Sequence, residues 1–240
     1  MTELCIVHSG PLSVSVWGRL RAHLPLGTTM RVLDLETITP YWEAGRSGEP
    51  GELTVAALAR RLRPELDPRP RRVLLGWGFG GLVAHALAGH ADHVIVLDTT
   101  APAAEPDELP DEALLGDFAA YLAVRRGRAL HLVTTPPVDD ALARLAGDTG
   151  LVGMRRLYVA YTRGRRRDRA LAAAHTPPDR PLTLVRAARG PAGALGWEDH
   201  ADLELLVSAG DHYSMLTEPA AVAHLAALLG RWLVPVSVAA

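Results

Sequence analysis

Short apolar segments alternate with segments of helical periodicity along most of the chain. After an apolar run at 4–7, for example, Val16, Leu20 and Leu24 recur at four-residue spacing, which predicts a strand followed by a helix. Apolar strands that alternate with helices are typical of a mainly parallel sheet covered on both faces, so the pattern predicts an α/β fold. We expect strands at 4–7, 31–35, 72–75, 93–98, 181–185 and 203–207, and further helices at 55–62, 82–88 and 217–232.

The alternation stops between about 101 and 180, where the sequence holds helical pieces and proline pairs but no convincing strand. We interpret this segment as a helical lid inserted into a single domain that spans 1–240. Among its apolar positions with helical spacing, Phe118, Met154 and Tyr158 are candidates to roof a substrate chamber. The same spacing also fits residues that only pack the lid onto the body of the domain.

The stretch VLLGWGFGGLVAHALA at 73–88 combines an apolar strand, a glycine-rich turn and a helix. In hydrolases this layout presents a nucleophilic serine on a sharp turn, but here the central position holds Gly78. Such a turn strains its central residue by roughly 1–3 kcal/mol when that residue has a side chain, and glycine lowers the cost because it has no Cβ. The sequence therefore predicts an intact turn without a nucleophile at its tip.

Asp98 and His212 stand where an acid and a base would follow this turn. Asp98 ends the strand at 93–98, and His212 lies in the loop SAGDHYSML directly after the last strand. Considered separately, Asp98 fits a turn former and His212 fits a surface or core histidine. In α/β hydrolases, however, the nucleophile, the acid and the histidine follow one another in this order and meet at one edge of the sheet. We therefore expect Asp98 to orient His212 beside Gly78.

The sequence resembles the thioesterase domains and free-standing thioesterases of polyketide and nonribosomal peptide assembly lines. Their turn commonly reads G-W-S-x-G-G, and residues 76–81, which we call the elbow, read GWGFGG. The likeness extends over nearly the whole chain and includes VHSGPLS at 7–13, VLDTTAP at 96–102 and GDHYSML at 210–216. It implies an α/β-hydrolase fold and a polyketide-like or peptide-like substrate, either free or tethered to an acyl carrier protein.

The resemblance also implies roles for the residues around the elbow. The backbone N–H of Phe79 and that of Ser9 or Gly10 would form an oxyanion hole, and Trp77 would line the chamber. In the family a serine forms a covalent acyl-enzyme intermediate, a route that Gly78 removes. Ser9 offers a substitute hydroxyl, although it would approach the base from the wrong side.

Three hypotheses about function remain open. The first is an enzyme in which His212, oriented by Asp98, acts as a general base for intramolecular cyclisation, elimination or isomerisation, because proximity can replace the missing nucleophile. The second is an ordinary chain-releasing acyl thioesterase whose serine has been replaced by glycine. The third is a noncatalytic binding or scaffold protein that keeps the chamber.

Composition restricts the classes of partner. Arginine supplies all 25 basic residues against 27 acidic ones, and the net charge of −2 gives no general attraction to nucleic acid or to an anionic membrane. The single cysteine, Cys5, lies in an apolar run, which predicts a buried thiol in a reducing compartment. The sequence shows neither an apolar run of membrane-spanning length nor a signal peptide, so we expect a soluble, cytoplasmic protein.

The remaining motifs are weaker. The sequence has no metal-ligand spacing and no phosphate or dinucleotide fingerprint, so we expect neither a metal nor a cofactor. A basic run at 163–169 contains five arginines. It fits either a docking patch for an acidic carrier protein or its phosphate, or an ordinary solvated helix face.

Overall fold

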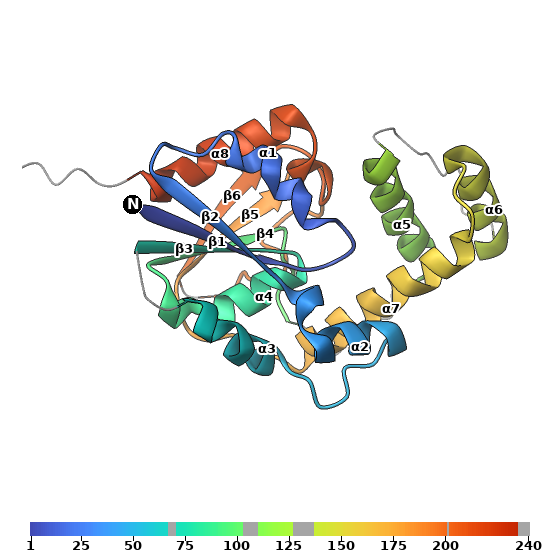
Figure 1. The fold of residues 1–240 in the computed structure, drawn as a ribbon, viewed down its shortest axis with the longest axis horizontal. Helices are drawn as coiled ribbons and strands as arrows, with labels where there is room; N and C mark the ends of the chain where they lie inside the picture. Colours follow the sequence, from blue (N-terminus) through green and yellow to red (C-terminus); the bar gives the residue numbers. More distant parts are fainter. Residues whose placement is uncertain (67–70, 103–109, 127–136, 201, 235–240) are drawn as a thin grey trace, which may run out of the picture.

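The computed structural model describes residues 1–66, 71–102, 110–126, 137–200 and 202–234. Its centre is a six-stranded sheet in the order β2-β1-β3-β4-β5-β6, in which every neighbouring pair is parallel (Figure 1). The strands are β1 (Thr2–His8), β2 (Thr28–Asp34), β3 (Arg71–Trp77), β4 (His93–Leu97), β5 (Leu182–Ala187) and β6 (Leu203–Ser208). Each predicted strand is present, and the predicted parallel α/β fold is confirmed.

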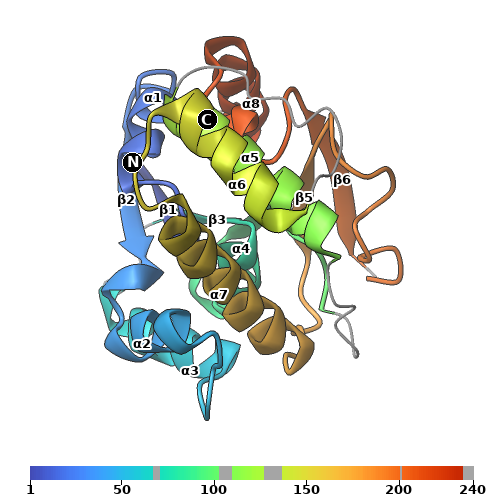
Figure 2. The same ribbon diagram turned by 90° about the vertical axis from the view of Figure 1, so that its right-hand side faces the viewer.

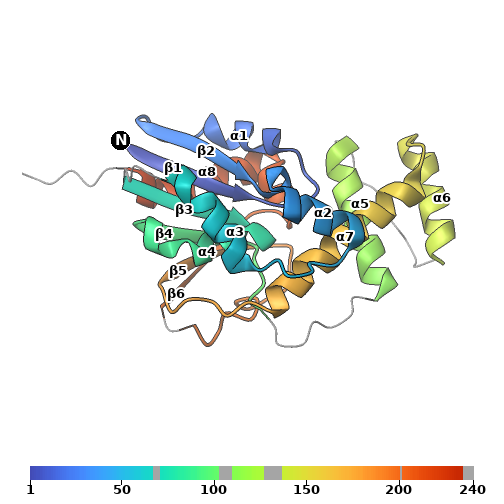
Figure 3. The ribbon, with the colours of Figure 1, turned by 60° about the horizontal axis from the view of Figure 1, so that its bottom comes forward.

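Side chains at alternate positions of the strands enter two apolar cores, one on each face of the sheet. In β1, Leu4 and Ile6 belong to one core, whereas Cys5 and Val7 belong to the other, because successive strand residues point to opposite faces. Burial also raises the pKa of the Cys5 thiol to about 12. The first face is covered by α1 (Trp17–Arg21) and α8 (Pro219–Leu233), and the second by α3 (Val55–Leu62) and α4 (Phe79–Ala86) (Figures 1 and 3).

Among the described residues between β4 and β5 lie three helices, which we call the helical insertion. They are α5 (Asp111–Arg126), α6 (Val138–Thr149) and α7 (Met154–Ala173), and they lie beyond the carboxyl ends of the strands (Figures 1 and 2). Their place in the chain matches the segment predicted at 101–180, of which 103–109 and 127–136 lie outside the described residues. That residues 1–240 form one domain, with this segment acting as a lid, remains a prediction.

Two helices differ from the sequence prediction. The helix expected at 16–24 is the five-residue α1, which follows a short 3-10 turn at Val14–Val16. The hydrophobic pattern does not predict α2 (Thr39–Ser47), because this helix buries only Tyr41 and Ala44 and so lacks a continuous apolar stripe. Proline in its first turn and Gly48 after its last residue are the local signals that mark it.

His85 on α4 is fully buried, which agrees with a role in packing. Its Nε2 lies 3.1 Å from the carbonyl oxygen of Arg180, and burial lowers its pKa from 6.5 to about 4. The folded protein therefore resists protonation of this ring at a pH where the unfolded chain accepts the proton.

We expect the free energy of unfolding to fall as the pH is lowered from 6.5 to about 4, because the unfolded chain then binds a proton that folded His85 excludes. At full extent this one group should account for about 3 kcal/mol. Urea unfolding at a series of pH values measures the effect, and His85→Leu should flatten the dependence. His23→Ala, at an exposed position, should keep the wild-type slope, whereas an unchanged slope in His85→Leu would contradict the prediction.

Candidate active site

The elbow connects β3 to α4, and Gly78 is its central residue. Gly78 is the N-cap of α4 with φ +54° and ψ −128°, a conformation that residues with a side chain rarely adopt. Gly80 lets the helix approach β1, because a Cβ at this position would lie 2.4 Å from the carbonyl oxygen of Val7. The sharp strand-turn-helix arrangement expected from the sequence is present.

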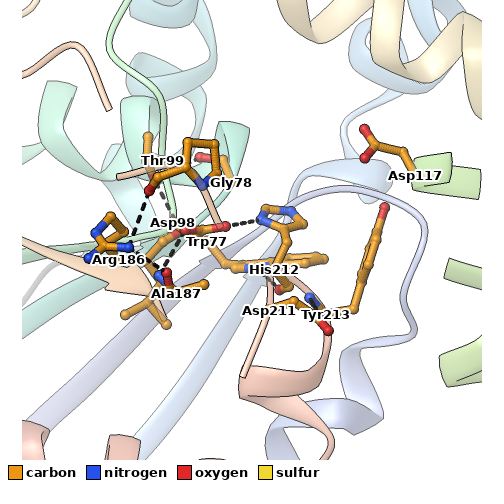
Figure 4. A network of polar contacts seen from close by, with 12 residues as sticks. Trp77, Gly78, Asp98, Thr99, Asp117, Arg186, Ala187, Asp211, His212 and Tyr213 are labelled. Carbon is orange, nitrogen blue, oxygen red and sulfur yellow. Dashed lines mark hydrogen bonds and ion pairs between the residues drawn. The ribbon is translucent and has the colours of Figure 1, made fainter. Parts of the chain in front are cut away.

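Asp98 and His212 meet at the carboxyl edge of the sheet (Figure 4). Oδ2 of Asp98 lies 2.8 Å from Nδ1 of His212, and its Oδ1 accepts a 2.9 Å hydrogen bond from the backbone N–H of Ala187. Burial alone would raise the pKa of Asp98, but the hydrogen bond and charge of His212, the Ala187 N–H and the charge of Arg186 together bring that pKa below its ordinary value. Asp98 is therefore ionised at neutral pH and accepts a hydrogen bond from the Nδ1–H of His212.

The second ring nitrogen of His212 faces the elbow. A Cβ at Gly78 would lie 3.5 Å from Nε2 and 3.3 Å from Cε1 of His212. Because the carboxylate of Asp98 accepts the hydrogen bond from Nδ1, the neutral ring carries its lone pair on Nε2. A basic nitrogen thus lies over a position that has no side chain.

Trp77 holds the loop that carries His212. The two rings stack with their centroids 4.6 Å apart and their planes at 25°, and the indole Nε1 donates a 3.0 Å hydrogen bond to the backbone carbonyl of His212. His8 also stacks on Trp77, with the ring centroids 6.1 Å apart. Since Trp77 ends β3, the histidine is positioned directly by the sheet. Sequence reasoning placed Trp77 in the chamber wall but identified neither this contact nor His8.

Ser9 ties the loop after β1 to the elbow. Its hydroxyl donates a 3.2 Å hydrogen bond to the carbonyl of Trp77 and accepts a 2.8 Å hydrogen bond from the N–H of Gly80. Both hydrogen bonds engage the Ser9 oxygen with the backbone of the elbow, which argues against Ser9 as a substitute nucleophile. Phe79 opens α4, so its N–H has no acceptor within the helix, and Gly10 adopts φ +91° in the facing loop.

A cavity of about 260 Å³ opens beside Gly78 and His212. The residues expected to form the oxyanion hole and its surroundings all contribute to its wall: Ser9, Gly10, Trp77 and Phe79. Most of the remaining wall comes from the helical insertion and the loop after β6, including Tyr121, Leu157, Tyr161, Arg165, Arg167 and Tyr213.

Phe118, Met154 and Tyr158 do not line this cavity. Phe118 is fully buried and meets the Tyr158 ring edge-on at 5.2 Å, so these side chains pack α5 against α7. Met154 belongs to the same apolar core. The helices of the insertion carry apolar side chains both toward one another and toward the cavity, so helical spacing alone does not distinguish the two faces.

Arg167 forms a buried ion cluster in the wall of the cavity, and the sequence pattern does not predict this cluster. Its Nε donates to Asp168 at 2.9 Å, Nη1 to the carbonyl of Tyr41 at 2.9 Å and Nη2 to Glu36 at 3.1 Å. The Tyr41 hydroxyl completes the cluster with a 2.8 Å hydrogen bond to Asp168. The sequence interpretation of the basic run as a docking patch or a solvated face is wrong for this residue, because only 2% of the Arg167 side chain is exposed.

Replacing Arg167 with methionine should lower the free energy of unfolding by about 3–5 kcal/mol, since it leaves Glu36 and Asp168 without their buried counter-charge. Urea or thermal unfolding measures the loss. Arg166→Met removes the same charge from an exposed neighbouring position and should change stability by less than about 0.5 kcal/mol. Equal stability of the two variants would show that the cluster contributes nothing.

Within the described residues, no group of three or more His, Cys, Asp or Glu side chains is arranged to hold a metal ion. In the same ranges no helix combines the length and apolar character needed to span a bilayer.

Comparison with known proteins finds likeness in sequence over part of the chain. No protein-family model matches it. A pimeloyl-[acyl-carrier protein] methyl ester esterase of Klebsiella pneumoniae is 34% identical over 100 residues, which are 41% of this chain and 36% of the esterase. A second esterase of the same name, from Klebsiella pneumoniae subsp. pneumoniae, is 34% identical over 86 residues. The matched segments thus span about a third of the curated relatives.

Solved structures match nearly the whole chain. A four-domain nonribosomal peptide synthetase, holo-AB3403, matches 98% of this chain over 20% of its own length, with a TM-score of 0.68 and 20% identity. The NocB thioesterase domain, in covalent complex with a fluorophosphonate nocardicin G analogue, matches 97% of this chain and 95% of its own, with a TM-score of 0.59 and 19% identity. The RedJ thioesterase of the prodiginine pathway in Streptomyces coelicolor matches 97% and 90%, with a TM-score of 0.59 and 17% identity. The chain therefore has the α/β-hydrolase fold, with an arrangement of elements similar to that of these thioesterase structures.

Proposed function

We propose that this chain is a thioesterase-like enzyme of polyketide or nonribosomal peptide biosynthesis in which His212, oriented by Asp98, acts as a general base without a covalent intermediate. The observation that carries the proposal is the position of Nε2 of His212, 3.5 Å from where a Cβ of residue 78 would lie. Nδ1 of the same ring is held by a carboxylate. A proton acceptor of this kind needs only a substrate that brings its own nucleophile or acidic C–H.

The comparisons support the biosynthetic setting of this proposal. The structural neighbours include thioesterase domains of the nocardicin and prodiginine pathways, and the name of the esterase relative describes a substrate held on an acyl carrier protein. By extension, we propose that the substrate here is a polyketide-like or peptide-like acyl chain, delivered as a carrier-bound thioester.

Elimination of water from a β-hydroxyacyl thioester illustrates the chemistry. Nε2 of His212 takes the proton from the carbon next to the carbonyl, and the electron pair of that C–H bond moves onto the carbonyl oxygen. The backbone N–H of Phe79, together with that of Ser9 or Gly10, would stabilise this oxyanion. Return of the electron pair forms the C=C bond and expels hydroxide, which takes the proton from Nε2 and leaves as water.

Cyclisation and isomerisation need the same base. In cyclisation, Nε2 takes the proton of an internal hydroxyl or amine as it attacks the thioester carbonyl, and the departing thiolate receives that proton. In isomerisation of an unsaturated acyl chain, loss of the proton gives a dienolate, and the proton returns to a different carbon of it. Asp98 stabilises the imidazolium in each case without itself becoming protonated.

A second candidate is a chain-releasing thioesterase in which glycine has replaced the nucleophilic serine. It is favoured by the surroundings of Gly78, where, among the described residues other than its two chain neighbours, an added Cβ would come within 4 Å only of ring atoms of His212. The site therefore has room for the serine of an ordinary acyl-enzyme route.

The two candidates are separated by incubating the wild type with N-acetylcysteamine thioesters that carry a β-hydroxyl, a terminal hydroxyl or a terminal amine. Liquid chromatography with mass spectrometry should show loss of one water, release of a cyclic product, or a new isomer of unchanged mass. Simple hydrolysis of every thioester, or recovery of every thioester unchanged, would contradict the general-base proposal.

A further inference from the structure

Arg165 contributes a positive charge to the cavity wall. Its guanidinium makes few of the hydrogen bonds that it could donate. It lies on α7, and its Nη2 donates a 3.2 Å hydrogen bond to Asp117 on α5. Its Nε is buried and has no hydrogen-bond partner among the residues that the structure describes. The Asp117 side chain is 44% exposed, so solvent screens this ion pair and another carboxylate can replace it.

Arg167 lies two residues further along α7 and differs from Arg165 in how its guanidinium is paired. Its three nitrogens all donate hydrogen bonds, and two carboxylates, Glu36 and Asp168, already balance its charge. An anion that enters the cavity therefore finds more unused donor capacity on Arg165, whose charge one carboxylate balances, than on Arg167, whose charge two carboxylates balance.

Two phenols beside Arg165 supply a further donor. The hydroxyls of Tyr161 and Tyr213 lie 2.9 Å apart, and both residues line the cavity. Since only one of these hydroxyls donates to the other, the second proton is not used within the pair. Burial raises the pKa of Tyr161 to about 12 and raises that of Tyr213 as well, while the nearby charge of Arg165 acts in the opposite direction. Both phenols therefore remain protonated at neutral pH.

These donors lie close to the proposed base. The rings of His212 and Tyr213 meet edge-on with their centroids 5.0 Å apart. Tyr213 and Asp117 lie on the side of His212 that faces away from Asp98 (Figure 4). A molecule whose reacting atom lies between Gly78 and His212 can thus reach Arg165 with a second polar group.

We propose that Arg165 and the Tyr161–Tyr213 pair bind a carboxylate of the substrate, so that the cavity selects acyl chains carrying an acidic group besides the reacting carbonyl. This inference rests on the proposed function only in taking the cavity to be the acyl site. A carboxylate fits the donor set, because a guanidinium and a hydroxyl can each donate to one of its two oxygens. A single negative charge also matches the single charge of Arg165.

The test is equilibrium binding of two matched amides, measured by titration calorimetry at neutral pH. One is the N-butyl monoamide of adipic acid, which carries a carboxylate, and the other is its methyl ester, which carries none. The wild type should bind the acid about tenfold more tightly than the ester, because charge-assisted hydrogen bonds are the stronger kind. Arg165→Gln should bring the two dissociation constants close together.

Three variants complete the experiment. Arg166→Gln removes the same charge from an exposed neighbouring position and should keep the preference. Asp117→Asn removes the carboxylate that competes for Arg165 and should increase the preference. His212→Ala should also keep it, which separates carboxylate binding from proton transfer: a failure of the proposed base would appear in turnover and leave the affinity ratio intact.

Three results would overturn the inference. They are equal binding of the two amides by the wild type, no binding of either amide, and a preference for the acid that survives Arg165→Gln. A preference that disappears in His212→Ala but persists in Arg165→Gln would assign the carboxylate to the imidazole instead.

Discussion

Replacing His212 with alanine is expected to lower kcat by about 10²- to 10⁴-fold on any thioester that the wild type converts, which is the usual contribution of a positioned general base. KM should change little, because the residues that line the cavity remain in place. Initial rates from chromatography with mass detection measure both constants. The physical reason is that Nε2 of His212 is the basic atom that lies over Gly78.

Asp98→Asn is the matched change at the other end of the dyad. The amide keeps the size of the carboxylate, but it cannot stabilise an imidazolium and no longer fixes the Nδ1–H tautomer. We expect kcat to fall with little change in the folded structure. His23→Ala, at an exposed histidine, should retain wild-type rates. Full activity in His212→Ala would exclude the general-base mechanism.

The Gly78→Ser variant is expected to react with a fluorophosphonate probe, whereas the wild type is expected not to react. The new hydroxyl would extend from a Cβ that lies 3.5 Å from Nε2 of His212. Its oxygen would then attack phosphorus, fluoride would leave and the imidazole would take the proton. The intact mass of the variant should rise by the mass of one probe minus that of HF, and that of the wild type should stay unchanged.

The same substitution should reduce stability. With φ +54° at position 78, a residue with a side chain is strained by roughly 1–3 kcal/mol, and thermal unfolding should show a lower Tm. The double variant Gly78→Ser, His212→Ala should be as strained but should not be labelled. Labelling of the wild type would place a nucleophile elsewhere in the cavity, and a folded but unreactive Gly78→Ser variant would contradict the placement of the base.

The features that the sequence predicts correctly are those set by local pattern and by chain order. The strands follow from short apolar runs, and the elbow follows from its closely spaced glycines. The contact between Asp98 and His212 spans 114 residues, yet it is predictable because the carboxyl ends of parallel strands meet at one edge of the sheet.

The features that the sequence does not predict depend on how separate helices approach one another. The contact of Arg167 with Tyr41 joins α7 to α2 across 126 residues, and no periodicity encodes it. In the sequence, Arg165 likewise belongs to an arginine run that fits a solvated helix face. In the structure, its position on α7 brings it to the cavity wall. For the same reason, Tyr161 and Tyr158, which lie about one turn apart, both contact Phe118, but of the two Tyr161 lines the cavity.

The cavity wall has two origins, and this has a consequence for engineering the protein. Gly78, Asp98, His212 and the Trp77 ring that supports the imidazole come from strand ends and the loops that follow them, whereas Tyr161 and Arg165 come from α7. Exchanging α5 to α7 for other helices, while keeping Asp98 directly after β4, would thus alter which molecules are accepted and leave Gly78, Asp98 and His212 in place. Selectivity and reaction type can be redesigned as independent modules.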